Sequence, residues 1–271
     1  MSISTVHTVR LGMTDLEVSP IAFGTWQLGG EWGQFDEAEG IAAIRHAREL
    51  GVNLFDTAQG YGFGASERLL GRALRDDLDK RRDEVVIATK GGLRMTDDGL
   101  VRDASPGWLR GGVEDSLRAL EVDHVDIYQV HWPDPEVPFA ESAGALGELV
   151  DEGKIRHIGW TRTRSSRPTT GAGGPRSSRA TPTAATSRPC ESSSASHRRS
   201  CGTSVGRLAI AWTLASPAVQ VAIVGARRRE HIEDSLVAAE LSLSEADLER
   251  IERIMADSAQ MTGPSPEMMP E

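Results

Sequence analysis

The sequence predicts an α/β fold, a (β/α)8 barrel of the TIM type that is interrupted after its fifth strand. Short apolar, β-branched runs alternate with helical stretches, which is typical of parallel βαβ units. Polar side chains follow the carboxyl ends of several of these runs, where barrel enzymes carry their functional groups. The composition of residues 161–203 predicts the interruption.

An N-terminal hairpin is expected ahead of five strand–helix units. Residues 6–18 alternate around Gly12 and Asp15, which predicts a hairpin that plugs the bottom of the barrel. A single barrel of about 250 residues fits the length of the chain. The five strands are expected at 20–26, 53–58, 84–90, 126–132 and 155–160.

The helices between these strands carry recognisable end signals. Asp36 with Glu39 forms a capping-box pattern. Ser105 followed by Pro106 places an N-cap before a proline at the first helical position. Glycine ends the first and the last of these helices. The four helices are expected at 36–50, 66–78, 105–120 and 139–152.

Residues 161–203 differ in composition from the rest of the chain. They contain no Leu, Ile, Val, Met, Phe, Tyr or Trp, so they cannot bury enough apolar surface to offset the entropy lost on ordering. Eight arginines against one acid give this segment +7, which leaves −17 on the remainder of a chain whose net charge is −10. Arginine outnumbers lysine 27 to 3, which is typical of GC-rich coding DNA. We interpret the segment as the product of a shifted reading frame and a deletion; a genuine insert is the alternative.

Regular patterns resume after this segment. A buried strand is expected at 219–226, and helices at 205–215, 229–239 and 244–255, the last with Ser244 and Asp247 in capping-box spacing. The predicted organisation is therefore two parts of one barrel, 1–160 and 204–257, separated by a disordered segment at 161–203 and followed by a disordered, Pro-rich tail at 258–271.

Four polar side chains at or just past successive strand ends make a proton-donating site: Asp56, Tyr61, Lys90 and His131. A phenol with a pKa of about 10 is a poor donor at neutral pH until a nearby cation favours its ionised form, so Lys90 would activate Tyr61. Asp56 would hold Lys90 charged and oriented. His131 would donate to a carbonyl oxygen and fix the angle of a substrate.

Each of these residues also has a purely structural interpretation. Asp56 with Lys90 could form a structural ion pair, and Tyr61 could be a turn aromatic with a satisfied hydroxyl. His131 could be a histidine that merely ends its strand. The local sequence around the four residues favours the catalytic interpretation over these alternatives.

Three segments of the chain resemble those that carry the catalytic tetrad of the aldo-keto reductases. They are Phe55-Asp56-Thr57-Ala58 with Gly60-Tyr61-Gly62 and Ser66-Glu67, then Ile87-Ala88-Thr89-Lys90, and then Tyr128-Gln129-Val130-His131-Trp132. The resemblance extends over residues 5–160 and 204–257. It implies a catalytic tetrad of Tyr61, Lys90, Asp56 and His131. It also implies carbonyl reduction with a nicotinamide, usually NADPH (NADP+), because no side chain can deliver a hydride.

A second motif, Ile223-Val224-Gly225-Ala226-Arg227, runs from a strand through a glycine turn toward a helix that begins near Arg229. Free N–H groups at a helix start bind phosphate, and barrels often place phosphate sites here. Arg227 would pair with a 2′-phosphate and favour NADP over NAD, unless residues 227–229 are only a solvated basic run. The resemblance places Gly225, Ala226 and Arg227 at the adenosine phosphate and His231, Asp234 and Ser235 near the adenine.

The nicotinamide end of the predicted cofactor site departs from the family pattern. By resemblance it would include Gly24, Thr25, Trp26, Asp56 and Thr161. Thr161 can replace a hydroxyl that holds the carboxamide, whereas Arg162 cannot accept a hydrogen bond where the family carries an amide. The glutamine of the family's sixth strand and the stacking aromatic of its seventh have no candidate in this sequence. The substrate mouth would be lined by Trp26, Tyr61, His131 and Trp132.

Composition and charge bound the remaining possibilities. The N-terminus lacks a basic and then apolar leader, and the longest apolar run, 208–215, is far short of a membrane span, so we expect a cytoplasmic protein without a membrane partner. Cys190 and Cys201 match no metal-ligand spacing. Residues 161–203 lack the aromatics and lysines of a nucleic-acid-binding segment.

The sequence therefore predicts an NADP-dependent oxidoreductase that reduces a small carbonyl substrate. Two alternatives stay open. The chain could be an inactive, frame-disrupted reductase with exposed sheet edges, or a non-catalytic subunit that senses the cofactor. The sequence identifies neither the substrate nor the oligomeric state.

Overall fold

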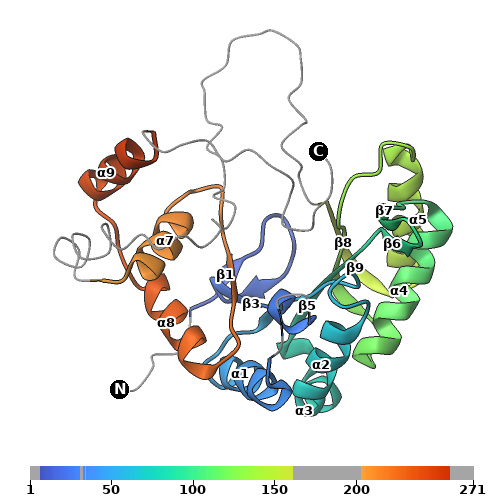
Figure 1. Cartoon of the computed structure of the whole chain (residues 1–271), viewed down its shortest axis with the longest axis horizontal. Helices are drawn as coiled ribbons and strands as arrows, with labels where there is room; N and C mark the ends of the chain where they lie inside the picture. Colours follow the sequence, from blue (N-terminus) through green and yellow to red (C-terminus); the bar gives the residue numbers. More distant parts are fainter. Residues whose placement is uncertain (1–6, 31–32, 34, 161–202, 257–271) are drawn as a thin grey trace, which may run out of the picture.

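The computed structural model describes residues 7–30, 33, 35–160 and 203–256 (Figure 1). The segment predicted at 161–203, apart from its last residue, and the tail predicted at 258–271 lie outside the described residues. Thr161 of the predicted cofactor site lies there too, so its contact with the carboxamide stays a prediction.

A six-stranded parallel sheet forms the centre of the molecule (Figure 1). In the part of the chain that the structure describes, β10 and β9 are its two edge strands. All six predicted barrel strands are confirmed, and five of them are shorter than expected. From edge to edge the order is β10 (Ala222–Gly225), β3 (Ile21–Gly24), β4 (Leu54–Asp56), β5 (Val86–Gly91), β8 (Val125–Val130) and β9 (Ile155–Trp160).

Helices cover the outer side of this sheet (Figure 1). They pack against one another in the order α7, α8, α1, α2, α4, α5, with α3 and α9 at the margins. None of the helices in the described ranges is both long and apolar enough to cross a membrane. Their bounds are α1 (Glu37–Glu49), α2 (Ala65–Ala73), α3 (Arg75–Lys80), α4 (Pro106–Leu120), α5 (Phe139–Asp151), α7 (Val205–Leu214), α8 (Arg229–Ala239) and α9 (Glu245–Ala256).

The capping signals of the sequence have the expected effect at both ends of the chain. Asp36 accepts hydrogen bonds from the amides of Ala38 and Glu39 at the start of α1. At α9, Ser244 and Asp247 exchange the reciprocal hydrogen bonds of a capping box. These local bonds satisfy amides that a helix start leaves without partners.

The side chains of each strand alternate between two apolar clusters. Ile21, Phe55 and Ile87 point outward into the large core beneath the helices. Ala22, Leu54, Val86, Ala88 and Ile127 point inward and form a second, smaller core. Because alternation continues to the ends of the strands, it decides which polar side chains face the barrel interior.

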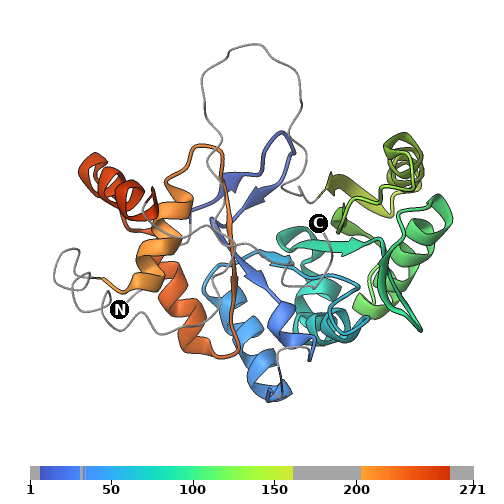
Figure 2. The same ribbon diagram turned by 45° about the horizontal axis from the view of Figure 1, so that its top comes forward.

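The N-terminal hairpin closes the inner face of the sheet, as the sequence predicts. It consists of β1 (Val9–Arg10) and β2 (Glu17–Val18), which pair antiparallel. Leu16 and Val18 are buried in the inner cluster. Figure 2 shows the hairpin on the side of the sheet opposite to α1 and α2.

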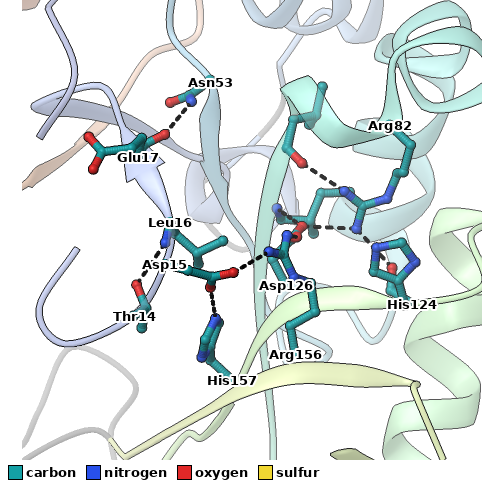
Figure 3. A network of polar contacts seen from close by, with 12 residues as sticks. Thr14, Asp15, Leu16, Glu17, Asn53, Arg82, His124, Asp126, Arg156 and His157 are labelled. Carbon is teal, nitrogen blue, oxygen red and sulfur yellow. Dashed lines mark hydrogen bonds and ion pairs between the residues drawn. The ribbon is translucent and has the colours of Figure 1, made fainter. Parts of the chain in front are cut away.

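A charged network fixes the bottom of the barrel, at the amino ends of the strands (Figure 3). The fully buried carboxylate of Asp126 accepts hydrogen bonds from Arg82 at 2.9 Å and from Arg156 at 2.8 Å. Asp15, in the turn of the hairpin, accepts from Arg156 and His157. The hairpin is thereby tied to β9 across the floor of the barrel.

Two of the differences in extent change how the chain continues. The helix expected at 66–78 is divided into α2 and α3 at Leu74, because Arg45 of α1 donates to the carbonyls of Arg72 and Ala73. The strand expected to reach Trp26 ends at Gly24, and a 3-10 helix, η1 (Trp26–Leu28), follows it.

A hairpin after β5 was not predicted. It consists of β6 (Leu93–Thr96) and β7 (Gly99–Arg102), which pair antiparallel. Asp97 and Asp98 form its turn, and Gly99, which pairs with Thr96, has a φ of +115°, a conformation that favours glycine. The adjacent Asp98-Gly99 pair is a turn signal in the sequence that would have indicated a hairpin here.

Candidate active site

The four predicted residues come together at the carboxyl end of the sheet. Asp56 ends β4, Lys90 lies near the end of β5, and His131 directly follows β8. By the alternation of each strand, all three continue the inward-facing rows of the small core. Tyr61 reaches the same place from the loop after β4. The strand order predicted from the sequence is what makes these residues neighbours.

Lys90 is the centre of the cluster. Its Nζ donates to Asp56 Oδ1 at 2.6 Å and to the carbonyl oxygen of Thr57 at 2.9 Å. The same nitrogen lies 3.4 Å from the hydroxyl oxygen of Tyr61. The ammonium therefore bridges a carboxylate and a phenol.

Aromatic rings enclose Tyr61. The Trp26 ring stacks on it at a centroid distance of 6.0 Å, and His131 meets it edge-on at 5.6 Å. The loop that carries Tyr61 continues through Gly62, Phe63 and Gly64, all with positive φ. Phe63 at φ +46° is a strained position for a residue with a side chain. The Tyr61 ring is therefore fixed by packing against Trp26 and His131, at the start of a tightly turned loop.

Burial and neighbouring charges together determine the protonation states in this cluster. The exposed fractions of Asp56, Tyr61, Lys90 and His131 lie between 4 and 8%. Burial alone would lower the pKa of Lys90, but Asp56 and Tyr61 outweigh it, and its pKa is raised. Burial and then the charge of Lys90 lower the pKa of His131 to about 3. At neutral pH the site thus contains an ammonium beside a neutral imidazole.

A buried hydroxyl network, whose role was not predicted, lies behind the cluster. Ser66 Oγ donates to Thr25 Oγ1 at 2.6 Å, and Thr57 Oγ1 donates to Ser66 Oγ at 3.2 Å. The amide of Thr25 donates to the carbonyl oxygen of Asp56 at 2.9 Å. The network fixes the backbone on either side of the carboxylate that binds Lys90. Its sequence signal was Ser66, which follows the tyrosine turn.

The predicted phosphate turn lies beside the first strand. Gly225 of β10 pairs with Gly24 of β3, so the turn adjoins Thr25 and Trp26. A Cβ added to Gly225 would lie 2.1–2.4 Å from the side-chain amide of Gln27. Gln27 Oε1 is buried and has no hydrogen-bond partner among the described residues. A glycine cradle with an unsatisfied acceptor beside it fits a bound cofactor.

The start of α8 completes this turn. Ala226 is buried, and the amide of Arg227 donates to His231 Nδ1 at 3.4 Å. Asp234 accepts from Arg207 of α7 at 2.6 and 2.7 Å, and Ser235 Oγ donates to the carbonyl of His231. The predicted adenine residues therefore lie on one helix, and all three already have partners within the protein.

Trp132 lies next to His131 and has a separate contact. The guanidinium carbon of Arg102, on β7, lies 5.5 Å from the centroid of the Trp132 ring. The hairpin that was not predicted thus reaches the predicted substrate mouth. It supplies Arg102, a charged residue that was not among those predicted to line the mouth.

Comparison with known proteins identifies a single family. The profile of the aldo/keto reductase family matches residues 20–168 and 169–256. The aldo-keto reductase YhdN of Bacillus subtilis (strain 168) is 46% identical over 147 residues, which are 54% of this chain and 44% of that protein. The NADH-specific methylglyoxal reductase of Escherichia coli (strain K12) is 40% identical over 167 residues, 56% of this chain and 50% of that protein. The chain spans about half the length of the curated relatives it matches.

Solved structures support the barrel architecture. An aldo-keto reductase of Klebsiella pneumoniae, solved in complex with NADPH, superposes with a TM-score of 0.70 at 23% identity, covering 96% of this chain and 98% of that one. The fold is therefore that of a TIM barrel, of which the described residues form six parallel strands.

Proposed function

Since the chain belongs to the aldo/keto reductase family, we propose that it reduces a small aldehyde or ketone with hydride from NADPH and that Tyr61 donates the proton. The observation that carries this proposal is the position of Lys90 Nζ, 2.6 Å from Asp56 and 3.4 Å from the Tyr61 hydroxyl. An ammonium at this distance stabilises the phenolate that forms when Tyr61 gives up its proton.

Each residue of the cluster has one role in the proposed step. A bound nicotinamide supplies the hydride to the carbonyl carbon. The developing alkoxide oxygen takes the proton of the Tyr61 hydroxyl, and Lys90 stabilises the negative charge left on the phenol oxygen. Asp56 keeps Lys90 charged and in place. His131, neutral because of its lowered pKa, donates one N–H to the carbonyl oxygen.

The residues that would hold the cofactor lie at the carboxyl ends of β3 and β10. Gly225, Ala226 and the start of α8 would hold the adenosine phosphate, and Gln27 Oε1 would accept a hydrogen bond from the cofactor. Gly24, Thr25 and Trp26 would contact the nicotinamide half. One relative is NADH-specific and one neighbour was solved with NADPH, so the family uses both cofactors. Arg227, two residues before α8 begins, would favour the 2′-phosphate of NADPH.

The test is the oxidation of NADPH by purified protein in the presence of small carbonyl compounds. Methylglyoxal, the substrate named for one relative, is a suitable first compound. We expect carbonyl-dependent loss of NADPH absorbance that Tyr61→Phe abolishes. Turnover that is unchanged in Tyr61→Phe would contradict the proposed proton donor. Tight NADPH binding without turnover for any carbonyl would instead indicate a cofactor-sensing protein.

A further inference from the structure

Glu67 is a buried acid that belongs to neither the proposed catalytic cluster nor the proposed cofactor turn. It lies in the first turn of α2, which directly follows the Tyr61 loop (residues 57–64), and its exposed fraction is 0%. The other buried acids of the described ranges each form an ion pair with a lysine or an arginine; they are Asp56, Asp77 and Asp126. The hydrogen bond that Glu67 accepts comes instead from a hydroxyl group on β5.

This hydrogen bond joins the helix after the Tyr61 loop to the strand that carries Lys90. Thr89 Oγ1 donates to Glu67 Oε1 at 2.7 Å, and both side chains are buried. Thr89 directly precedes Lys90 on β5, and alternation turns the two side chains to opposite faces of the sheet. The bond therefore lies on the outer face, at the strand position next to the lysine of the proposed cluster.

The Tyr61 loop is bonded to β5 on both sides of the tyrosine. Near the start of the loop, the amide of Gln59 donates to the carbonyl oxygen of Lys90 at 2.9 Å. Just beyond its end, Glu67 accepts from Thr89. Tyr61 lies between these two attachments, so its distance from β5 depends on both of them.

The backbone between the two attachments is strained. Phe63, which follows Tyr61 in the loop, has a φ of +46°, a conformation that is costly for a residue with a large side chain. Such a conformation persists only where the surrounding structure holds it. The attachments at Gln59 and Glu67 therefore keep in place a loop that would otherwise relax.

The contact between Tyr61 and Lys90 is too long to fix the phenol by itself. Lys90 Nζ lies 3.4 Å from the Tyr61 hydroxyl but 2.6 Å from Asp56 Oδ1. A hydrogen bond at the longer distance is weak. The position of the phenol is therefore set by the packing of its ring and by the attachments of its loop. Its separation from Lys90 determines how strongly the ammonium acts on it.

We infer that Glu67 and Thr89 are positioning residues for the proposed proton transfer, because their hydrogen bond holds the Tyr61 loop against β5. The inference rests on the proposed function, in which Tyr61 is the proton donor. Without the bond, the loop relaxes away from β5, and the phenol loses part of the stabilisation that Lys90 gives its ionised form. A purely structural role would instead lower stability and leave the ionisation of Tyr61 unchanged.

The ionisation of Tyr61 can be measured directly, because the chain contains only two tyrosines. Burial, and then the charges of Glu67 and Asp115, raise the pKa of the other one, Tyr128. An absorbance titration of tyrosinate in the whole chain therefore reports on Tyr61 first as the pH rises. The measurement needs neither cofactor nor substrate.

Thr89→Val removes the hydroxyl and keeps the shape of the side chain. We expect it to raise the midpoint of the Tyr61 titration by about one pH unit. Thr89→Ser keeps the hydroxyl and should titrate as the unsubstituted protein does. Ser142→Ala is the matched control on α5, because it removes a buried hydroxyl that donates to the carbonyl oxygen of Ala104, also at 2.7 Å. It should lower stability without moving the midpoint.

Two substitutions of Glu67 separate the hydrogen bond from the negative charge. Glu67→Gln keeps an oxygen that can accept from Thr89, whereas Glu67→Met has a similar length and only a weak acceptor. Loss of the charge alone would shift the Tyr61 titration equally in both variants. Loss of positioning should give Glu67→Met a higher midpoint than Glu67→Gln.

Two results would overturn the inference. One is a cooperatively folded Thr89→Val protein in which Tyr61 ionises at the same pH as in the unsubstituted protein. The other is an equal midpoint in Glu67→Gln and Glu67→Met, a comparison that does not require Thr89→Val to fold.

The titration and the carbonyl assay can fail independently. Unchanged turnover in Tyr61→Phe would remove Tyr61 as the proton donor, but it would not alter the effect of the Glu67–Thr89 bond on the ionisation of Tyr61. Where carbonyl reduction is observed, Thr89→Val should lower kcat about tenfold and leave the KM for NADPH unchanged, because a displaced catalytic group slows the chemical step.

Discussion

The proposed catalytic cluster and the proposed cofactor turn differ in how firmly the sheet supports them. The cluster comes from β4, β5 and β8, three neighbouring strands with partners on both sides, and its four side chains are at most 8% exposed. The cofactor turn follows β10, which pairs only with β3 among the described strands. Ile223 on β10 is 56% exposed, although it belongs to a barrel strand.

Because the two regions are supported by different parts of the fold, we expect proton donation and cofactor binding to depend on different residues. The residues of the proposed proton-donating cluster all come from consecutive βα units before residue 161. The cofactor turn depends on one strand pairing, between β10 and β3, and on the packing of α8 against α1. Changes to the cluster should therefore affect turnover and stability, while changes to the turn should affect cofactor affinity.

The largest effect should come from Tyr61→Phe. Loss of a general acid lowers a rate by about 10²–10⁴-fold, and the phenyl ring keeps the packing against Trp26. We expect kcat to fall in this range while the Kd for NADPH changes by less than about twofold. Single-turnover kinetics and fluorescence titration measure the two quantities. If kcat and the affinity for NADPH fell by the same factor, the cluster and the cofactor turn would not have separate functions.

Lys90→Met should cost the most stability. It leaves the carboxylate of Asp56 buried without its cation, a change that typically costs about 3–5 kcal/mol. Urea denaturation measures the free energy of unfolding. As a control, Asp56→Asn combined with Lys90→Met should recover part of the loss, because no charge is then buried. A cost below about 1 kcal/mol would mean that Asp56 and Lys90 do not interact strongly in solution.

The buried His131 should make stability depend on pH. Its folded pKa of about 3 lies below that of an unfolded histidine, so the unfolded state binds an extra proton between about pH 6.5 and pH 3. The free energy of unfolding should therefore fall with decreasing pH, by up to about 1.4 kcal/mol per unit. His131→Gln should remove this slope. If the free energy of unfolding depended on pH in the same way in both proteins, the pKa of His131 would not be lowered in the folded state.

The smallest effect should come from Arg227→Ala, in the cofactor turn. Loss of a charged contact to the 2′-phosphate should raise the KM for NADPH roughly tenfold and leave that for NADH and the kcat unchanged. Arg228→Ala, one residue further along the same basic run, is the matched control. Equal effects of the two substitutions would support the alternative that residues 227–229 are only a solvated basic run.

The sequence was sufficient to predict the strands and the clustering of Asp56, Tyr61, Lys90 and His131, whose catalytic role stays a prediction. Strand ends read from apolar runs placed Asp56, Lys90 and His131 at one end of the sheet, because parallel strands share their direction. Alternation alone then turns these side chains inward. These features depend on local sequence and on one architectural rule, which is why they could be predicted.

Features that depend on contacts distant in sequence were not predicted. The division of α2 from α3 depends on Arg45, which reaches across from α1. The network of Thr25, Thr57 and Ser66 joins the segments after β3 and β4 to α2. The contact of Gln27 with Gly225 bridges nearly the whole chain. Such contacts leave no periodic signal in one sequence.

We propose that the described parts of the chain fold together as one barrel. In this barrel the cofactor turn binds NADPH beside the proposed catalytic cluster. Thermal unfolding with NADPH, with NADH and without ligand tests it most directly, because a ligand that binds only the folded state raises the midpoint. We predict one cooperative transition whose midpoint rises with NADPH and less with NADH. A transition that is not cooperative, or one that neither cofactor shifts, would contradict this claim.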